Sequence, residues 1–158
     1  MQIRTAPVAK AGMLIRRPVE EVFEAFIDPA ITSKFWFSGG SGRLDAGKPV
    51  TWTWDWYGVS TQVDVKEIVP DRKILVDWNV GTDRPSTVEW TFAERPDGTA
   101  FVDIRNFGFR GDADAQVQEA LDSTGGFTWV LAGAKAWLEH GIALGLVPDR
   151  FPEAHVKP

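Results

Sequence analysis

The sequence predicts an α+β fold, in which a curved antiparallel sheet wraps around a long C-terminal helix and two short helices follow the first strand. Short segments of alternating polar and apolar residues, separated by turns with glycine and proline, fill the middle of the chain. Apolar residues at helical spacing precede these segments and return from Phe127 onward. An antiparallel sheet needs cover on one face, which the last helix provides if the sheet curls around it.

The N-terminal part is expected to form one strand and two helices. Residues 8–15 are the predicted strand, and Pro18 opens the first helix because proline fits the first helical turn. The pair Asp28-Pro29 ends that helix, and a short second helix is expected at residues 29–34. A loop of glycine and serine at residues 38–42 is expected beside the mouth of a pocket.

Six further strands are expected, at residues 42–44, 50–57, 60–69, 73–80, 87–93 and 100–109. Trp52, Trp54 and Trp56 occupy alternate positions of one strand, so we expect them to share one face of the sheet. The apolar residues at the start and at the end of the last strand fall on opposite faces of the sheet. A bulge near Asn106 would bring both sets to the same face.

The last helix is expected from Phe127 to about residue 144, after an acidic, weakly helical stretch that Gly125 and Gly126 interrupt. Gly145 and Pro148 are expected to stop this helix, and the tail from Asp149 is expected to be irregular. No repeat or linker divides the chain. We therefore expect a single domain over residues 1–158, with its core at about residues 8–147.

Composition excludes several classes of protein. The net charge is −5, and the largest cluster of basic residues is the pair Arg16-Arg17, so nucleic acid is not an expected partner. No charge-free apolar run approaches the length of a membrane span, and no signal peptide is evident. The absence of cysteine excludes disulfides and thiolate metal sites. We expect a cytoplasmic protein without membrane contact.

Three segments together resemble a known family. The first is residues 17–26 followed by Asp28-Pro29, the second is the pair Phe35-Trp36, and the third is the pattern Gly126-Phe127-x3-Leu131-x2-Ala134-Lys135-x2-Leu138-Glu139. They are similar to the START-like, polyketide-cyclase-like (SRPBCC) superfamily, and within it to the small, mostly bacterial homologues of the heat-shock protein 90 ATPase activator. Phe127 stands where the family pattern has tryptophan, and Ala134 stands where it has leucine.

The resemblance implies a helix-grip fold with a cavity between sheet and last helix. It also implies three functions: binding of a hydrophobic or aromatic small molecule, a co-chaperone-like partner-binding module, or a cyclase- or hydrolase-like enzyme. Co-chaperones of this kind carry a large N-terminal domain that this chain lacks, so we expect chaperone activation to be the weaker alternative. A homodimer also stays open, because sheet edges and surplus aromatic residues favour association.

The polar residues give no catalytic constellation. His140 falls late in the last helix, where a cation suits the helix dipole, and His155 falls in the tail. Two histidines without cysteine give no zinc site, so neither a metal nor another cofactor is expected. Alternation places Asp77 and Glu89 on the face opposite to their apolar neighbours. That charged face either meets solvent or looks into a polar cavity.

Binding without catalysis is therefore the leading hypothesis. Each tryptophan ring buries a large area and its indole N–H needs a partner, so the surplus of rings favours a lined pocket over a plain core. Asn106 is the best single candidate for a polar group that points at a ligand. The expected ligand-binding residues are Trp36, Trp54, Trp78, Trp90, Asn106, Phe127, Leu131, Ala134 and Leu138.

Overall fold

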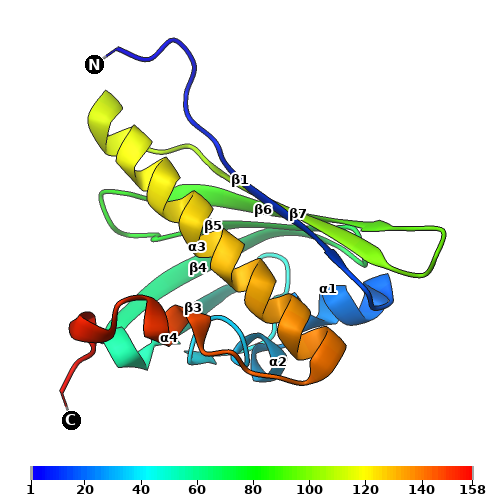
Figure 1. Ribbon diagram of the computed structural model, residues 1–158. Helices are drawn as coiled ribbons and strands as arrows, with labels where there is room; N and C mark the ends of the chain where they lie inside the picture. The colour runs from blue at the N-terminus through cyan, green and yellow to red at the C-terminus, as the bar shows by residue number, and fades with distance from the viewer. Residues whose placement is uncertain (1, 158) are drawn as a thin grey trace.

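The computed structural model describes residues 2–157 and confirms the α+β, helix-grip architecture. A seven-stranded antiparallel sheet with the order β1-β7-β6-β5-β4-β3-β2 curves around helix α3, which crosses its concave side (Figure 1). The strands are β1 (Ala9–Ile15), β2 (Gly39–Gly40), β3 (Pro49–Trp54), β4 (Val59–Val69), β5 (Lys73–Trp78), β6 (Ser86–Glu94) and β7 (Ala100–Phe107). No helix within residues 2–157 is both long enough and apolar enough to cross a membrane.

Two short helices follow β1, as expected. Helix α1 (Val19–Ile27) turns its apolar side to the core, where Phe23 meets Phe92 of β6 edge to face with ring centroids 5.2 Å apart. The Asp28 side chain then accepts a hydrogen bond of 3.0 Å from the Ala30 amide and caps α2 (Pro29–Thr32). The Asp-Pro pair therefore ends one helix and begins the next.

The two faces of the sheet differ as alternation demands. Inward residues of β5 to β7, such as Val76 and Val88, are fully buried. The charged face meets solvent, where Asp77 pairs with Lys66 at 3.4 Å and Asp103 with Arg105 at 3.5 Å. Of the two alternatives for the charged residues, the outward one is correct.

The expected bulge near Asn106 is wrong. Strand β7 pairs with β6 without interruption from Ala100 to Phe107, and the bulge of this sheet lies in β4, between Val65 and Glu67. Asn106 faces inward with Val102 and Ile104 of the same strand, and it is only 1% exposed. A buried asparagine is tolerated here because its amide is fully hydrogen bonded, so the strand does not need to change face.

Two further strand predictions fail at the other edge of the sheet. Strand β3 ends at Trp54, and Trp56 lies in a 3-10 turn, η1 (Asp55–Tyr57), so it does not continue the tryptophan row. Residues 42–44 form no strand; Gly39 and Gly40 pair with β3 instead. A Cβ on Gly40 would lie 2.9 Å from the Cβ of Pro29, so glycine permits this close approach.

Helix α3 (Ala113–His140) is longer than expected and begins 14 residues before Phe127. Asp112 caps it by accepting a hydrogen bond of 2.8 Å from the Ala115 amide. Gly125 and Gly126 weaken the helix without interrupting it, because glycine keeps its backbone N–H. The helix ends at Gly141, whose left-handed φ of 66° makes it the C-cap, rather than at Gly145.

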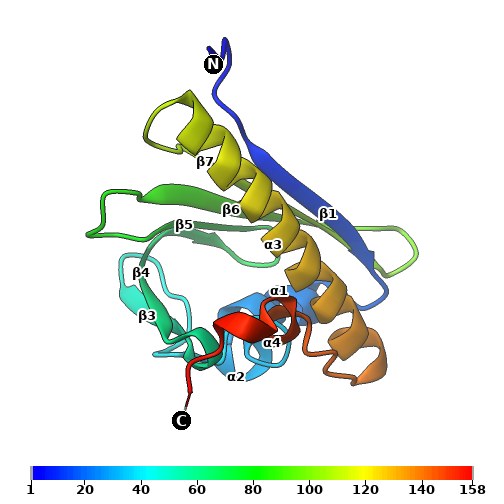
Figure 2. The ribbon, with the colours of Figure 1, turned by 60° about the vertical axis from the view of Figure 1, so that its left-hand side comes forward.

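The chain after α3 carries two short elements, which extend into the tail expected to be irregular from Asp149. It forms the short helix α4 (Leu146–Arg150), which includes Pro148, and a 3-10 turn, η2 (Pro152–Ala154). Figure 2 shows this segment, in red, turned back beside the end of the sheet that carries β3 and β4. The amide of Val156 donates to the Trp56 carbonyl at 2.8 Å. This return places the C-terminal segment against the cavity described next.

Candidate functional site

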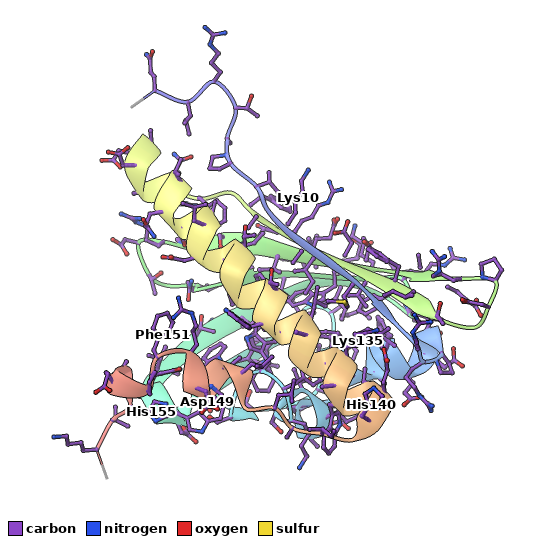
Figure 3. All side chains as sticks on the ribbon, viewed as in Figure 1. Lys10, Lys135, His140, Asp149, Phe151 and His155 are labelled. Carbon is purple, nitrogen blue, oxygen red and sulfur yellow. The ribbon has the colours of Figure 1, made fainter. Side chains whose placement is uncertain are left out.

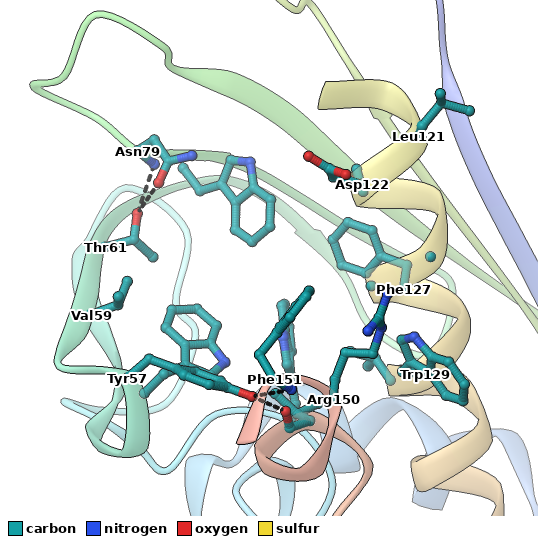
Figure 4. A pocket seen from close by; sticks show the side chains of 18 residues that line it. Tyr57, Val59, Thr61, Asn79, Leu121, Asp122, Phe127, Trp129, Arg150 and Phe151 are labelled. Atoms are coloured by element: carbon teal, nitrogen blue, oxygen red, sulfur yellow. Dashed lines mark hydrogen bonds between the residues drawn. The ribbon is translucent and has the colours of Figure 1, made fainter. Parts of the chain in front are cut away.

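A cavity of about 980 Å³ opens between the middle of α3 and the end of the sheet formed by β3, β4 and β5 (Figure 4). Seven of its 18 lining residues are aromatic. The lining residues are Trp36, Trp54, Tyr57, Val59, Thr61, Trp78, Asn79, Leu121, Asp122, Ser123, Gly125, Gly126, Phe127, Trp129, Val130, Val147, Arg150 and Phe151.

Aromatic rings in mutual contact form the deep wall. Trp36, which is 6% exposed, lies at their centre, with its ring centroid 6.1 Å from that of Trp54, 6.3 Å from Trp78 and 5.6 Å from Phe127. Trp78 and Phe127 stack with centroids 5.6 Å apart and planes 28° apart. Rings that are packed this way lose little freedom when a flat ligand arrives, so the wall is prepared for stacking.

A polar pair lies on the sheet side. Thr61 donates to Asn79 Oδ1 at 2.8 Å and accepts from the Asn79 backbone amide at 2.9 Å (Figure 4). Asn79 has a left-handed φ of 55° and lines the cavity, whereas strict alternation along β5 would place it on the outward face with Asp77. The sequence signal that could have found it is an asparagine directly after a strand, since asparagine tolerates this conformation.

The helix side offers hydrogen-bond acceptors and bare backbone. Asp122 and Ser123 line the cavity, and one carboxylate oxygen of Asp122 accepts from the Gln118 amide at 2.9 Å. Gly125 and Gly126 follow, and a Cβ built on either would meet no atom within 4 Å. Burial raises the pKa of Glu119, which precedes Asp122 by three residues in the same helix, above its ordinary value. Gly125 and Gly126 are a sequence signal that could have indicated this wall, but they were interpreted as a break in the helix.

The C-terminal segment forms the remaining side. The Tyr57 hydroxyl contacts the carbonyls of Val147 and Pro148, and it accepts a hydrogen bond of 3.3 Å from the Phe151 amide. Arg150 and Phe151 point from this segment toward the cavity, with the guanidinium 4.5 Å from the Phe151 ring centroid (Figure 4). No sequence pattern predicted this contact, because it depends on the return of the tail to Tyr57.

The structure brings four of the nine expected binding residues to the cavity: Trp36, Trp54, Trp78 and Phe127. The other five do not line it. Trp90, Asn106, Leu131 and Ala134 are at most 1% exposed within the core, and Leu138 packs against the core. The gap lies one to three turns nearer the N-terminus of α3 than the expected one at Leu131, Ala134 and Leu138. The rings of Trp36 and Phe127 occupy the space between Trp90 and the cavity.

The lining has little capacity for acid–base chemistry. Among the residues of the described part of the chain that line it, Asp122 is the one carboxylate, Arg150 is the one cation, and none is a histidine. His140 ends α3 and His155 lies in the C-terminal segment, so the two histidines are far apart (Figure 3). Within residues 2–157, no group of three His, Asp or Glu side chains is placed to hold a metal ion. The arrangement is suited to binding an apolar body with a few polar contacts.

The sheet, the crossing helix and the cavity between them define a START-like helix-grip domain. Residues 16–133 match the family model described as activator of Hsp90 ATPase homolog 1-like protein, so the chain belongs to that family, within the SRPBCC superfamily. No curated protein matches the sequence at a significant level.

Solved structures repeat the fold. SSP2350 from Staphylococcus saprophyticus is 27% identical with a TM-score of 0.71, over 87% of this chain and 95% of that one. The Aha1 dimer from Colwellia psychrerythraea is 14% identical with a TM-score of 0.71, over 85% and 97%. DynU16, from the dynemicin biosynthetic locus, is 18% identical with a TM-score of 0.77, over 88% of this chain and 49% of that one. At 14% and 18% identity, the last two show the fold alone.

Proposed function

We propose that the protein binds a hydrophobic or aromatic small molecule in the cavity between the sheet and α3, without transforming it. The observation that carries this proposal is a cavity of about 980 Å³ with seven aromatic residues in its lining. Sites for small molecules have volumes of this order, mostly apolar walls and a few convergent polar groups. A flat ligand would stack on the rings of Trp36, Trp54 and Trp78 and gain more than its area of burial alone.

Gly125 and Gly126 add support from energetics. Glycine inside a helix costs about 0.5–1 kcal/mol relative to alanine. Nothing in the packing excludes alanine at either position, since a Cβ on either glycine would meet open space. The two glycines therefore lower the stability of α3, and what they provide in return is a wider cavity with exposed backbone. A loss of stability in favour of binding is expected where a ligand approaches the helix closely.

The test is binding by the purified protein. Protein denatured directly after purification is examined by mass spectrometry for a released small molecule, and flat aromatic compounds are screened by thermal shift and tryptophan fluorescence. The rings around Trp36 would report a bound aromatic compound. A broad apolar panel that changes neither the fluorescence nor the melting temperature, together with an empty mass spectrum, would refute the proposal.

A matched pair of variants locates the site. Gly126→Leu places a side chain in the cavity and should abolish binding, because the Cβ position meets open space that a ligand would otherwise fill. Thr128→Leu adds a similar side chain at an exposed position of the same helix, outside the lining, and should bind as the wild type does. Equal binding by both variants would place the ligand elsewhere.

A second candidate is a partner-binding module, with a second copy of this chain as the partner. Large apolar side chains at the rim of the cavity are exposed, among them Leu121 at 64% and Trp129 at 41%. The structural neighbour from Colwellia psychrerythraea is described as a dimer. Sedimentation equilibrium tests this candidate: dimerisation that Leu121→Glu abolishes would favour it, and a monomer at all concentrations would exclude it. Activation of a chaperone ATPase by this chain alone would instead favour a chaperone as the partner.

A further inference from the structure

A buried hydrogen-bond chain behind the cavity fixes the orientation of Asn106. Its Nδ2 donates to the Thr87 backbone carbonyl at 2.8 Å and to Ser86 Oγ at 3.0 Å. A carbonyl oxygen only accepts, so the nitrogen side of the amide must face Thr87. The Oδ1 side therefore faces Ser123, whose Oγ lies 2.7 Å away. Because Asn106 is 1% exposed, a reversed amide would leave buried groups unpaired.

This orientation decides what Ser123 presents to the cavity. Asn106 Oδ1 accepts, so the single hydroxyl hydrogen of Ser123 is donated to it, and the Ser123 oxygen keeps only acceptor capacity. Thr124 and Thr128, the next hydroxyl residues along the helix, donate to backbone carbonyls of α3 instead of to a side chain, at 2.8 and 2.7 Å. No donor within residues 2–157 is hydrogen bonded to the Ser123 oxygen, although Ser123 lines the cavity.

The residues around Ser123 indicate which kind of ligand group would donate a hydrogen bond to its oxygen. Ser123 precedes Phe127 by four residues, so the two side chains share one face of α3. Asp122 beside it is likewise an acceptor. A ring that lies against Phe127 and Trp78 would bring a substituent on its edge to Ser123. An ether or carbonyl oxygen there would meet only acceptors, whereas a hydroxyl group would donate.

We propose that the ligand is an aromatic compound with a phenolic hydroxyl, which donates its hydrogen to Ser123 Oγ while its ring stacks beside Phe127. This inference rests on the proposed function, because it names the ligand class for the same cavity. Asn106 is a positioning residue in this scheme: it does not line the cavity, and it acts by holding the Ser123 hydrogen away from it.

The experiment compares two probes of nearly the same shape, 2-naphthol and 2-methoxynaphthalene, by isothermal titration calorimetry at pH 7. The wild type should bind 2-naphthol about three- to tenfold more tightly, the range expected for one neutral hydrogen bond. Ser123→Ala should lower the affinity for 2-naphthol to that for the ether, and leave the affinity for the ether unchanged. Ser123→Thr keeps a hydroxyl and should restore the preference.

Thr124→Val is the matched control, because it removes the neighbouring hydroxyl, which lies outside the lining. It should keep the preference for 2-naphthol. Equal affinities of the wild type for the two probes would overturn the inference and leave the proposed function standing. A preference that survives in Ser123→Ala would overturn it as well. Failure of both probes to bind would overturn the inference, and the broad apolar panel and the mass spectrum would then decide the proposed function.

Discussion

Trp78 of β5 and Phe127 of α3 stack across the space between the sheet and the helix, with ring centroids 5.6 Å apart. The Trp78 indole donates to Ser86 Oγ at 2.8 Å, which fixes the plane of its ring. Both rings line the cavity, and both contact Trp36, which is buried. The pair thus connects the cavity to the core, and a change in either ring affects both stability and binding.

Phe127→Ala should therefore destabilise the protein strongly. Phe127 is 4% exposed, and truncation of a buried phenylalanine to alanine costs about 3–5 kcal/mol. Thr128→Ala, at the next residue, removes an exposed side chain and should cost less than about 1 kcal/mol. Urea unfolding followed by circular dichroism measures both free energies. Similar losses for the two variants would show that Phe127 does not join the helix to the core.

Replacement of Gly125 or Gly126 by alanine should raise the stability of the protein and lower its affinity for a ligand. Gly125→Ala and Gly126→Ala should each stabilise the protein by about 0.5–1 kcal/mol, because the new methyl group meets open space and the helix gains propensity. The same methyl groups enter the cavity, so the affinity for 2-naphthol should fall. Thermal unfolding and calorimetry measure the two effects on the same samples.

Gly133→Ala is the matched control in the same helix. A Cβ there would lie 3.1 Å from the Cβ and 3.2 Å from the backbone oxygen of Phe35, and the backbone cannot move aside easily. This variant should lose stability and keep its affinity, since Gly133 does not line the large cavity. If Gly126→Ala gained stability without losing affinity, the glycine pair would have no role in binding.

Much of this fold could be predicted from the sequence because its signals are local. Pro18, the Asp28-Pro29 pair and five of the alternating strands each predicted an element to within two residues, and the resemblance supplied their arrangement. The strands expected at residues 42–44 and 50–57 were less accurate. The errors arose where tertiary packing outweighed a local preference. Gly125 and Gly126 looked like a break, but a helix capped by Asp112 and packed on the sheet tolerates two glycines.

The candidate site was predicted only in its aromatic part. Alternation along a strand predicts which rings face inward, as it does for Trp54 and Trp78. The contribution of Asn79 depends on one left-handed residue, and that of Arg150 on a tail that returns to Tyr57 over about 90 residues of sequence. Ser123 could not be predicted for another reason. The sequence indicates a polar residue on an inward strand position at Asn106, but it does not show that Ser123 is the hydrogen-bond partner that connects Asn106 to the cavity.

Tyr57→Phe should loosen the C-terminal segment. The Tyr57 hydroxyl contacts the Val147 and Pro148 carbonyls and accepts from the Phe151 amide, so its loss removes the polar anchor of this side of the cavity. Global stability should fall by only about 0.5–1.5 kcal/mol, whereas exchange of the Phe151 amide should accelerate and bound 2-naphthol should dissociate faster. Hydrogen exchange and stopped-flow fluorescence measure these effects. Unchanged exchange at Phe151 would mean that other contacts hold the segment.

Glu139 should make stability depend on pH. Its side chain is 8% exposed, and burial by itself would raise its pKa. Hydrogen bonds from Lys135 at 2.6 Å and from the Arg16 amide at 2.9 Å outweigh burial and hold the pKa below its ordinary value. A carboxyl group whose pKa is lower in the folded state stabilises the fold above its unfolded pKa of about 4.3, and this contribution is lost as the pH falls through the folded value.

Glu139→Gln should therefore be less stable than the wild type at pH 7, by about 1 kcal/mol or more, and the difference should shrink as the pH is lowered from 5 toward 2. Urea unfolding across this range measures the difference. Glu153→Gln is the control, because Glu153 is exposed and forms no ion pair within residues 2–157, so its difference from the wild type should stay near zero. A difference for Glu139→Gln that is constant with pH would show that the Lys135 and Arg16 contacts stabilise the protonated and ionised forms of Glu139 equally.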